Sequence, residues 1–134
     1  MWSNTMISQS KVAQIKSLSE FTAEPLFGAV ITRLLSREKL PAVGFDHVHI
    51  PRGSALEPHI HEASESFIYI LEGTAVVTLD DQQRTVVAGD TIYIPPGMSH
   101  SFSTPATAVV LLSVQSPPIY PEDSTPDIHF NARA

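Results

Sequence analysis

The chain has 134 residues, 43% of them hydrophobic and 16% charged, which is enough for one domain with a single core but too little for two. Fourteen acidic and eight basic residues leave a formal net charge of -6, so we expect no basic surface for a nucleic-acid backbone. The sequence contains no cysteine, which excludes disulfides, thiolate metal sites and thiol nucleophiles.

The amino-terminal region, residues 1–25, is predicted to form an arm on a single domain that extends over residues 1–134. Within this arm, residues 11–21 (KVAQIKSLSEF) favour a short strand and one helical turn. Residues 1–14 lack the basic start and the apolar stretch of a secretory signal, and no apolar run approaches membrane-spanning length. We therefore expect a cytoplasmic protein without a membrane partner.

From residue 26 onward, period-two alternation and turn residues dominate the chain. Asp80, Asp81 and Gln82 are typical of a hairpin turn, and the Pro-Pro-Gly at 95–97 breaks the chain between two strands. Many short strands at this spacing are typical of an all-β sandwich or barrel. We expect strands at residues 26–35, 43–50, 66–73, 74–79, 84–87, 91–94, 100–103 and 108–114.

The carboxyl-terminal segment, residues 115–134, carries four prolines and shows no alternation. This composition indicates either a Pro-rich tail or an extended arm, and we favour a loose tail in which His129 is solvated. An arm would instead bury the apolar side chains of the segment, which are Ile119, Tyr120, Ile128 and Phe130.

Three histidines stand in two short frames that each begin with a glycine. His59 and His61 follow Gly53, and His100 follows Gly89. Side chains two residues apart share one face of an extended strand, and the second frame can bring a third imidazole to meet the first two. Neutral imidazole binds Fe, Mn, Ni, Cu or Zn. We therefore predict one divalent metal ion bound by the three histidines.

The two frames carry a family resemblance. GSALEPHIHEASESFIYILEG at 53–73 and GDTIYIPPGMSHSFST at 89–104 resemble the paired motifs of the cupin superfamily. The fifteen residues between Gly73 and Gly89 resemble the short spacing of compact bacterial members. The resemblance implies a cupin jelly-roll barrel, which is a double-stranded β-helix of two antiparallel sheets with a divalent metal near one end. It does not specify an activity.

The carboxylate of the first motif is ambiguous in this chain. Counting forward from His61 leads to Glu65, whereas counting back from Gly73 leads to Ser66. Side chains alternate between the two faces of a strand, so a shift of one residue turns a ligand outward. If the strand keeps the family register, Ser66 and Ile68 face the barrel interior and Glu65 lies at its mouth. If a bulge follows Glu65, its carboxylate turns inward as a fourth metal ligand. Both alternatives stay open.

Further residues are candidates for the pocket wall. Phe102 lies two residues after His100 and should share its face beside the metal. His47 and His49 share one face of another strand, where they would either line the pocket as proton donors and acceptors or form a polar outer face. We slightly favour the outer face.

The segment from Phe67 to Leu71 is apolar on both faces, because Phe67, Tyr69 and Leu71 alternate with Ile68 and Ile70. Such a strand should be covered on both sides, by the barrel interior and by a second subunit. The family resemblance likewise implies a homodimer.

The predicted function is that of a small-molecule-binding cupin with a divalent metal site. We expect a metal-dependent enzyme, dioxygenase-like or isomerase-like, that acts on a small organic substrate. The alternative is a non-catalytic ligand-binding or sensor cupin whose metal site is empty or vestigial. The fold does not decide between these two functions, because one barrel hosts many activities.

Overall fold

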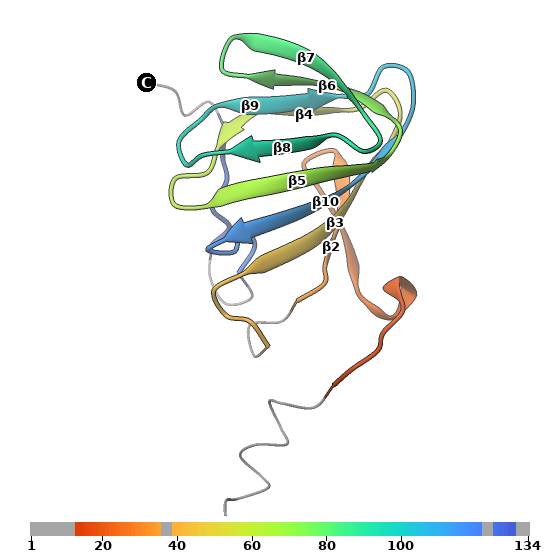
Figure 1. The fold of residues 1–134 in the computed structure, drawn as a ribbon, viewed down its shortest axis with the longest axis vertical. Coiled ribbons are helices and arrows are strands. Elements are labelled where there is room, and N and C mark those ends of the chain that lie inside the picture. The colour runs from red at the N-terminus through yellow and green to blue at the C-terminus, as the bar shows by residue number, and fades with distance from the viewer. Residues whose placement is uncertain (1–12, 36–38, 122–124, 131–134) are drawn as a thin grey trace, which may run out of the picture.

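The fold is an all-β barrel made from two antiparallel sheets (Figure 1), as predicted. The computed structural model describes residues 13–35, 39–121 and 125–130. The six-stranded sheet has the order β1 (Ala23–Leu26), β2 (Ala29–Arg33), β3 (Gly44–Ile50), β10 (Val109–Ser116), β5 (Glu65–Glu72) and β8 (Thr91–Ile94). The five-stranded sheet has the order β11 (His129–Phe130), β4 (Ala55–Ile60), β9 (His100–Ser103), β6 (Thr74–Leu79) and β7 (Gln82–Val87).

Most of the expected strands form close to their predicted bounds, and the differences have local causes. The segment 26–35 is two strands rather than one, because Phe27 and Gly28 take positive φ angles of 55° and 84° and turn the chain between β1 and β2. A 3-10 turn, η1, forms at Leu18–Glu20. The part of 11–21 that the structure describes contains no strand, and residues 11 and 12 lie outside the described residues.

The core fills the space between the inner faces of the two sheets. β5 shows why the sequence folds this way, since Ser66, Ile68 and Ile70 are buried while the residues between them are exposed. Val77 on β6 and Phe102 on β9 are buried on the opposite sheet. This alternation places an apolar layer inside the barrel. In the described residues, no helix is long and apolar enough to cross a membrane.

Residues 125–130 lie against the barrel as an arm. His129 and Phe130 form β11, which pairs with β4 through Ile60 and His59. The Phe130 ring lies 4.9 Å from the ring of Phe27, between ring centroids. In the same carboxyl-terminal segment, Ile119 is buried. The favoured interpretation of a loose tail therefore does not describe this part of the chain, because its apolar side chains and its backbone both find partners on the barrel.

Candidate metal centre

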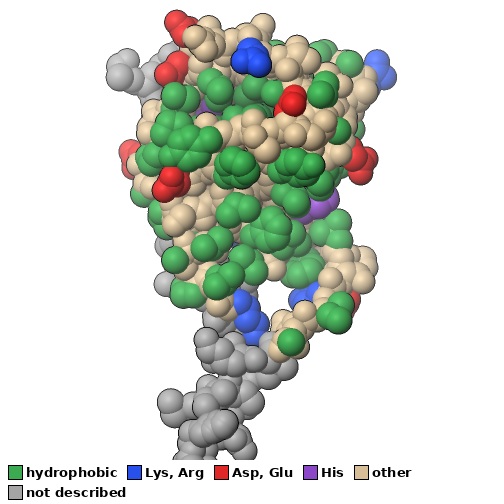
Figure 2. All heavy atoms as spheres, in the orientation of Figure 1, with side chains coloured by type: hydrophobic (Ala, Val, Ile, Leu, Met, Phe, Trp, Pro, Cys, Tyr) green, Lys and Arg blue, Asp and Glu red, His purple; other side chains and the backbone are tan. Residues whose placement is uncertain are grey.

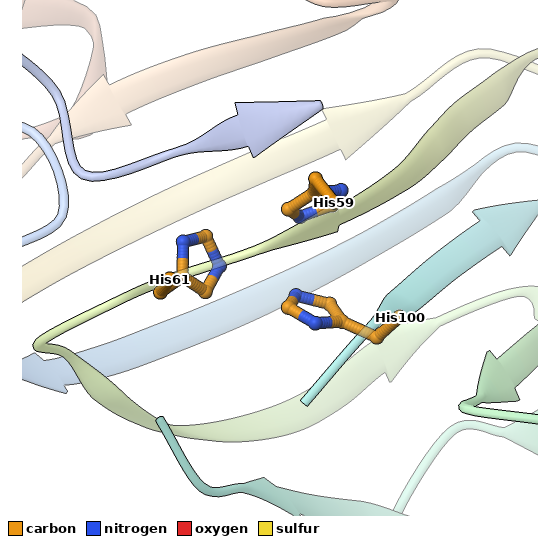
Figure 3. Close-up of side chains that lie close together, drawn as sticks. All are labelled: His59, His61 and His100. Carbon is orange, nitrogen blue, oxygen red and sulfur yellow. The ribbon is translucent and has the colours of Figure 1, made fainter. Parts of the chain in front are cut away.

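The three predicted histidines meet inside the barrel, as Figure 3 shows. His59 lies on β4, His61 is the first residue after that strand, and His100 is the first residue of β9. The pairing of β4 with β9 places His59 opposite His100, and alternation along the chain puts His61 on the same face as His59. The ring centroid of His59 lies 4.2 Å from that of His100 and 5.1 Å from that of His61. All three side chains are buried.

Each imidazole is oriented by a main-chain carbonyl. The Nδ1 atom of His59 bonds the carbonyl oxygen of Glu57 at 2.6 Å, that of His61 bonds Asp127 at 2.6 Å, and that of His100 bonds Met98 at 2.9 Å. A carbonyl oxygen only accepts hydrogen bonds, so each Nδ1 carries the proton and each Nε2 keeps a lone pair. One ring nitrogen from each histidine lies within 4.8 Å of those of the other two.

The electrostatics of the cluster keep the imidazoles neutral. Burial lowers the pKa of His59 to about 4 and that of His100 to about 3, and it also lowers the pKa of His61. The proximity of the other rings lowers the pKa of His100 further. Neutral imidazoles with free lone pairs are the form that binds transition metals. The donor set therefore fits the divalent ion expected from the sequence.

Glu65 lies outside this cluster, which corrects the inclusion of Glu65 among the candidate ligands. Its side chain is on the exposed face of β5, where the carboxylate accepts a hydrogen bond from Tyr93 Oη at 2.8 Å. The inward bulge does not form, because β5 pairs with β10 in unbroken register from Glu65 to Ile70, and the register shift lies between Val110 and Leu111. Strand phase thus turns Ser66 inward and Glu65 outward.

The remaining pocket candidates divide between the two faces. Ser66, Ile68 and Phe102 line a cavity of about 60 Å³ next to the three histidines. His47 and His49 are only half-buried and alternate with the buried residues of β3, so they lie on the outer face of the sheet. This placement agrees with the favoured interpretation of these two histidines.

Three polar residues of the same cavity were missed by the sequence reasoning. The period-two signal could have revealed Asp46, because it alternates with His47 and shares the inward face with Val48 and Ile50. The other two come from β10 and the segment after it, where no motif marks them. The missed set is Asp46, Ser113 and Tyr120.

A second group of polar side chains lies at the surface beside His61. His129 Nε2 is 3.0 Å from Asp127 Oδ1 and 3.5 Å from Glu62 Oε1. The Asp127 carboxylate also accepts the backbone N–H groups of Glu62, Ala63 and Ser64 at 2.8, 2.9 and 3.0 Å. His129 is therefore paired rather than simply solvated. Asp127 anchors the loop that follows His61.

The cupin domain model matches residues 46–115, which is more than half of the chain. This chain belongs to the cupin family. An uncharacterized protein of Methanocaldococcus jannaschii is 38% identical over 76 residues, which are 57% of this cupin and 61% of the relative. Quercetin 2,3-dioxygenase of Bacillus subtilis is 28% identical over 79 residues, which are 58% of this cupin and 23% of the enzyme.

This cupin thus spans less than two thirds of the length of these two curated relatives. Among solved structures, a predicted oxalate decarboxylase from Thermotoga maritima superimposes with a TM-score of 0.71 at 26% identity. That superposition covers 77% of this cupin and 98% of the other chain. The family resemblance of the two sequence motifs is confirmed by these matches.

Proposed function

We propose that this cupin binds one divalent transition-metal ion through His59, His61 and His100 and acts as an enzyme on a small organic molecule in the adjoining cavity. The observation that carries the proposal is the set of three Nδ1 bonds to main-chain carbonyls, which leaves three Nε2 lone pairs for one ion. The relative named quercetin 2,3-dioxygenase supports a dioxygenase-like reaction. An isomerase-like reaction is the second possibility for the same site.

The chain's own residues prepare the site for this chemistry. Buried neutral imidazoles present their lone pairs without first losing a proton, and the apolar side chains of Val48, Ile68 and Leu111 line the adjoining cavity. A bound ion would supply Lewis acidity and, if it is redox-active, a place for dioxygen. Three protein ligands leave coordination positions for a substrate oxygen.

Elemental analysis tests the metal site directly. The protein is purified without a histidine tag and without added metal, and the ions per chain are counted in the wild type, in His59→Ala and in His47→Ala. We expect up to one ion per chain in the wild type and in His47→Ala, whose imidazole lies on the outer face. The His59→Ala variant should lose the ion. Unchanged stoichiometry in His59→Ala would falsify the ligand assignment.

The alternative function is a ligand-binding cupin without turnover. It is favoured by one observation: in the described residues the buried histidine cluster includes no carboxylate. A metal-loaded protein that is thermally stabilised by candidate ligands but forms no product would support this alternative. Product formation that disappears in His59→Ala would support the enzyme.

We also propose a homodimer that forms through the outer face of β5, β8 and β10. Hydrophobic side chains gather on this side of the molecule (Figure 2). Phe67 is 49% exposed and Tyr93 is 53% exposed. Tyr69, Leu71 and Val114 belong to the same exposed face. A contiguous apolar surface of this kind is typical of a protein interface.

Sedimentation velocity tests the dimer with a matched pair of variants. Phe67→Asp should shift the protein to monomer, whereas Val87→Asp, which is 47% exposed on the other sheet, should not. A monomeric wild type would contradict the proposed dimer. A cytoplasmic location and the lack of a nucleic-acid partner stay predictions, the second of them supported by the net charge of -6.

A further inference from the structure

The cavity beside the three histidines has a second polar wall. Asp46 lies on β3 of the six-stranded sheet and is only 3% exposed. The histidines come from β4, β9 and the residue after β4, in the other sheet. Asp46 and the histidines line the same cavity, with apolar side chains in the lining as well. A ligand in this cavity therefore meets polar groups from both sheets.

Gln115 holds the Asp46 carboxylate in place. Gln115 Nε2 donates to Asp46 Oδ2 at 2.8 Å and to Ser113 Oγ at 2.8 Å. Gln115 Oε1 accepts the backbone N–H of Ile119 at 3.0 Å. Because both ends of the amide are bonded and the side chain is buried, Gln115 cannot turn away. The carboxylate is thus held at one position on the cavity wall.

The Asp46 carboxylate has hydrogen-bonding capacity to spare. An ionised carboxylate offers about four acceptor positions. In the ranges that the structure describes, the side-chain partner of Asp46 is Gln115 alone. Burial raises the pKa of Asp46 to about 6, although the Gln115 bond and the Arg33 charge act in the opposite direction. A buried carboxylate with so few donors destabilises the folded chain unless a further donor reaches it.

Asp127 shows how a structural carboxylate is satisfied in the same chain. It accepts three backbone N–H groups from the loop at 62–64. Partial burial would raise the pKa of Asp127, but these bonds and the contact with His129 lower it to about 2. In Asp46, by contrast, the pKa of the carboxyl is raised, and its side-chain hydrogen bond comes from Gln115. An anchoring role alone does not explain why a carboxylate stands at position 46.

Ser66 is an independent sign of a ligand at this wall. Its side chain is 3% exposed, and its Oγ atom is buried with no hydrogen-bond partner among the described residues. Ser66 lines the same cavity and lies directly opposite Gln115 in the pairing of β5 with β10. Asp46 and Ser66 therefore flank Gln115 on the inner face of the sheet, and both have unused hydrogen-bonding capacity.

We propose that Asp46 and Ser66 form a hydrogen-bonding subsite for a hydroxyl group of the ligand, whose other end carries an oxygen donor held at the three histidines. The inference rests on the proposed metal site. The cavity volume of about 60 Å³ restricts the ligand to a few heavy atoms, and Ile68 and Leu111 favour a carbon chain between its polar ends. The ligand class is a short hydroxy acid with a terminal carboxylate.

Calorimetric titration of the zinc-loaded protein tests the subsite. The probes are three matched pairs: glycolate and acetate, 3-hydroxypropionate and propionate, and 4-hydroxybutyrate and butyrate. In at least one pair the hydroxy acid should bind the wild type about tenfold more tightly, because its hydroxyl group forms a hydrogen bond to a buried charged group. Asp46→Ala should reduce this preference to less than about twofold, and Ser66→Ala should reduce it in part. His49→Ala, on the outer face of the same strand, should keep it.

The outcomes separate the subsite from the metal site. Wild-type protein that binds zinc but has equal affinity for both members of every pair overturns the subsite and leaves the proposed metal site standing. Protein that binds no zinc overturns the metal site and the subsite with it. If Asp46→Ala does not fold, Asp46→Asn keeps the bond from Gln115 without the charge. A hydroxy-acid preference that is unchanged in Asp46→Asn overturns the inference.

Discussion

Asp127 connects the carboxyl-terminal arm to the metal centre, and its removal should weaken both the fold and metal binding. Its main-chain oxygen accepts the Nδ1 proton of His61, while its carboxylate holds three N–H groups of the loop that follows His61. In Asp127→Ala the main-chain oxygen survives but loses its anchor. The imidazole of His61 is then free to rotate or to change tautomer.

The magnitude follows from the bonds that are lost. Three hydrogen bonds, each contributing about 0.5–1.5 kcal/mol and partly screened by solvent, lower the free energy of unfolding by about 2 kcal/mol in Asp127→Ala. Loss of an interaction that orients a metal ligand typically weakens metal affinity by about 10–100-fold. The loss of metal affinity in Asp127→Ala should therefore be larger than the loss caused by a substitution that changes surface contacts alone.

Two assays and one control variant test this reasoning. Zinc affinity is measured by competition with a chelator, and the tautomer of His61 is read from nitrogen-15 NMR spectra of the metal-free protein. His129→Ala, on the same arm, removes only the contacts of that imidazole with Asp127 and Glu62 and should change the affinity by less than about threefold. If Asp127→Ala loses stability but keeps wild-type zinc affinity and a single His61 tautomer, the coupling is refuted.

Three further predictions concern charge, backbone and strand phase. The pKa of Asp46 is raised from 3.8 to about 6 in the folded chain, so the protonated carboxyl stabilises the fold below pH 4. This contribution to the free energy of unfolding is lost as the pH rises to about 6. Asp46→Asn should therefore gain up to about 3 kcal/mol at pH 7.5 but little at pH 4 in urea denaturation, and an equal gain at both pH values would contradict this. Gly73→Ala should lose more than about 2 kcal/mol, because φ is +88° and the new Cβ would collide with the Ala108 carbonyl. Gly89→Ala, with φ of +95° and open space around it, should lose only about 1 kcal/mol, and equal losses in thermal denaturation would disprove the collision. Glu65→Gln should keep the wild-type number of ions per chain, and a lower count in elemental analysis would return Glu65 to the ligand set.

The fold class and the three histidines were within reach of the sequence because their signals are local. Alternation in the segments around His59 and Ile68 shows which side chains share a strand face, and glycines and prolines mark the turns between strands. The choice between Glu65 and Ser66 was not local. It depended on how β5 pairs with β10 and β8, and those strands lie far along the chain.

The sequence by itself determined an all-β barrel and which three imidazoles share its interior, since strand period and turn chemistry act over a few residues. Only the tertiary structure decided what surrounds those imidazoles. Gln115 reaches Asp46 across 69 positions of the chain, and Asp127 reaches His61 across 66. Contacts of such separation depend on strand order and register, which no local pattern of residues encodes.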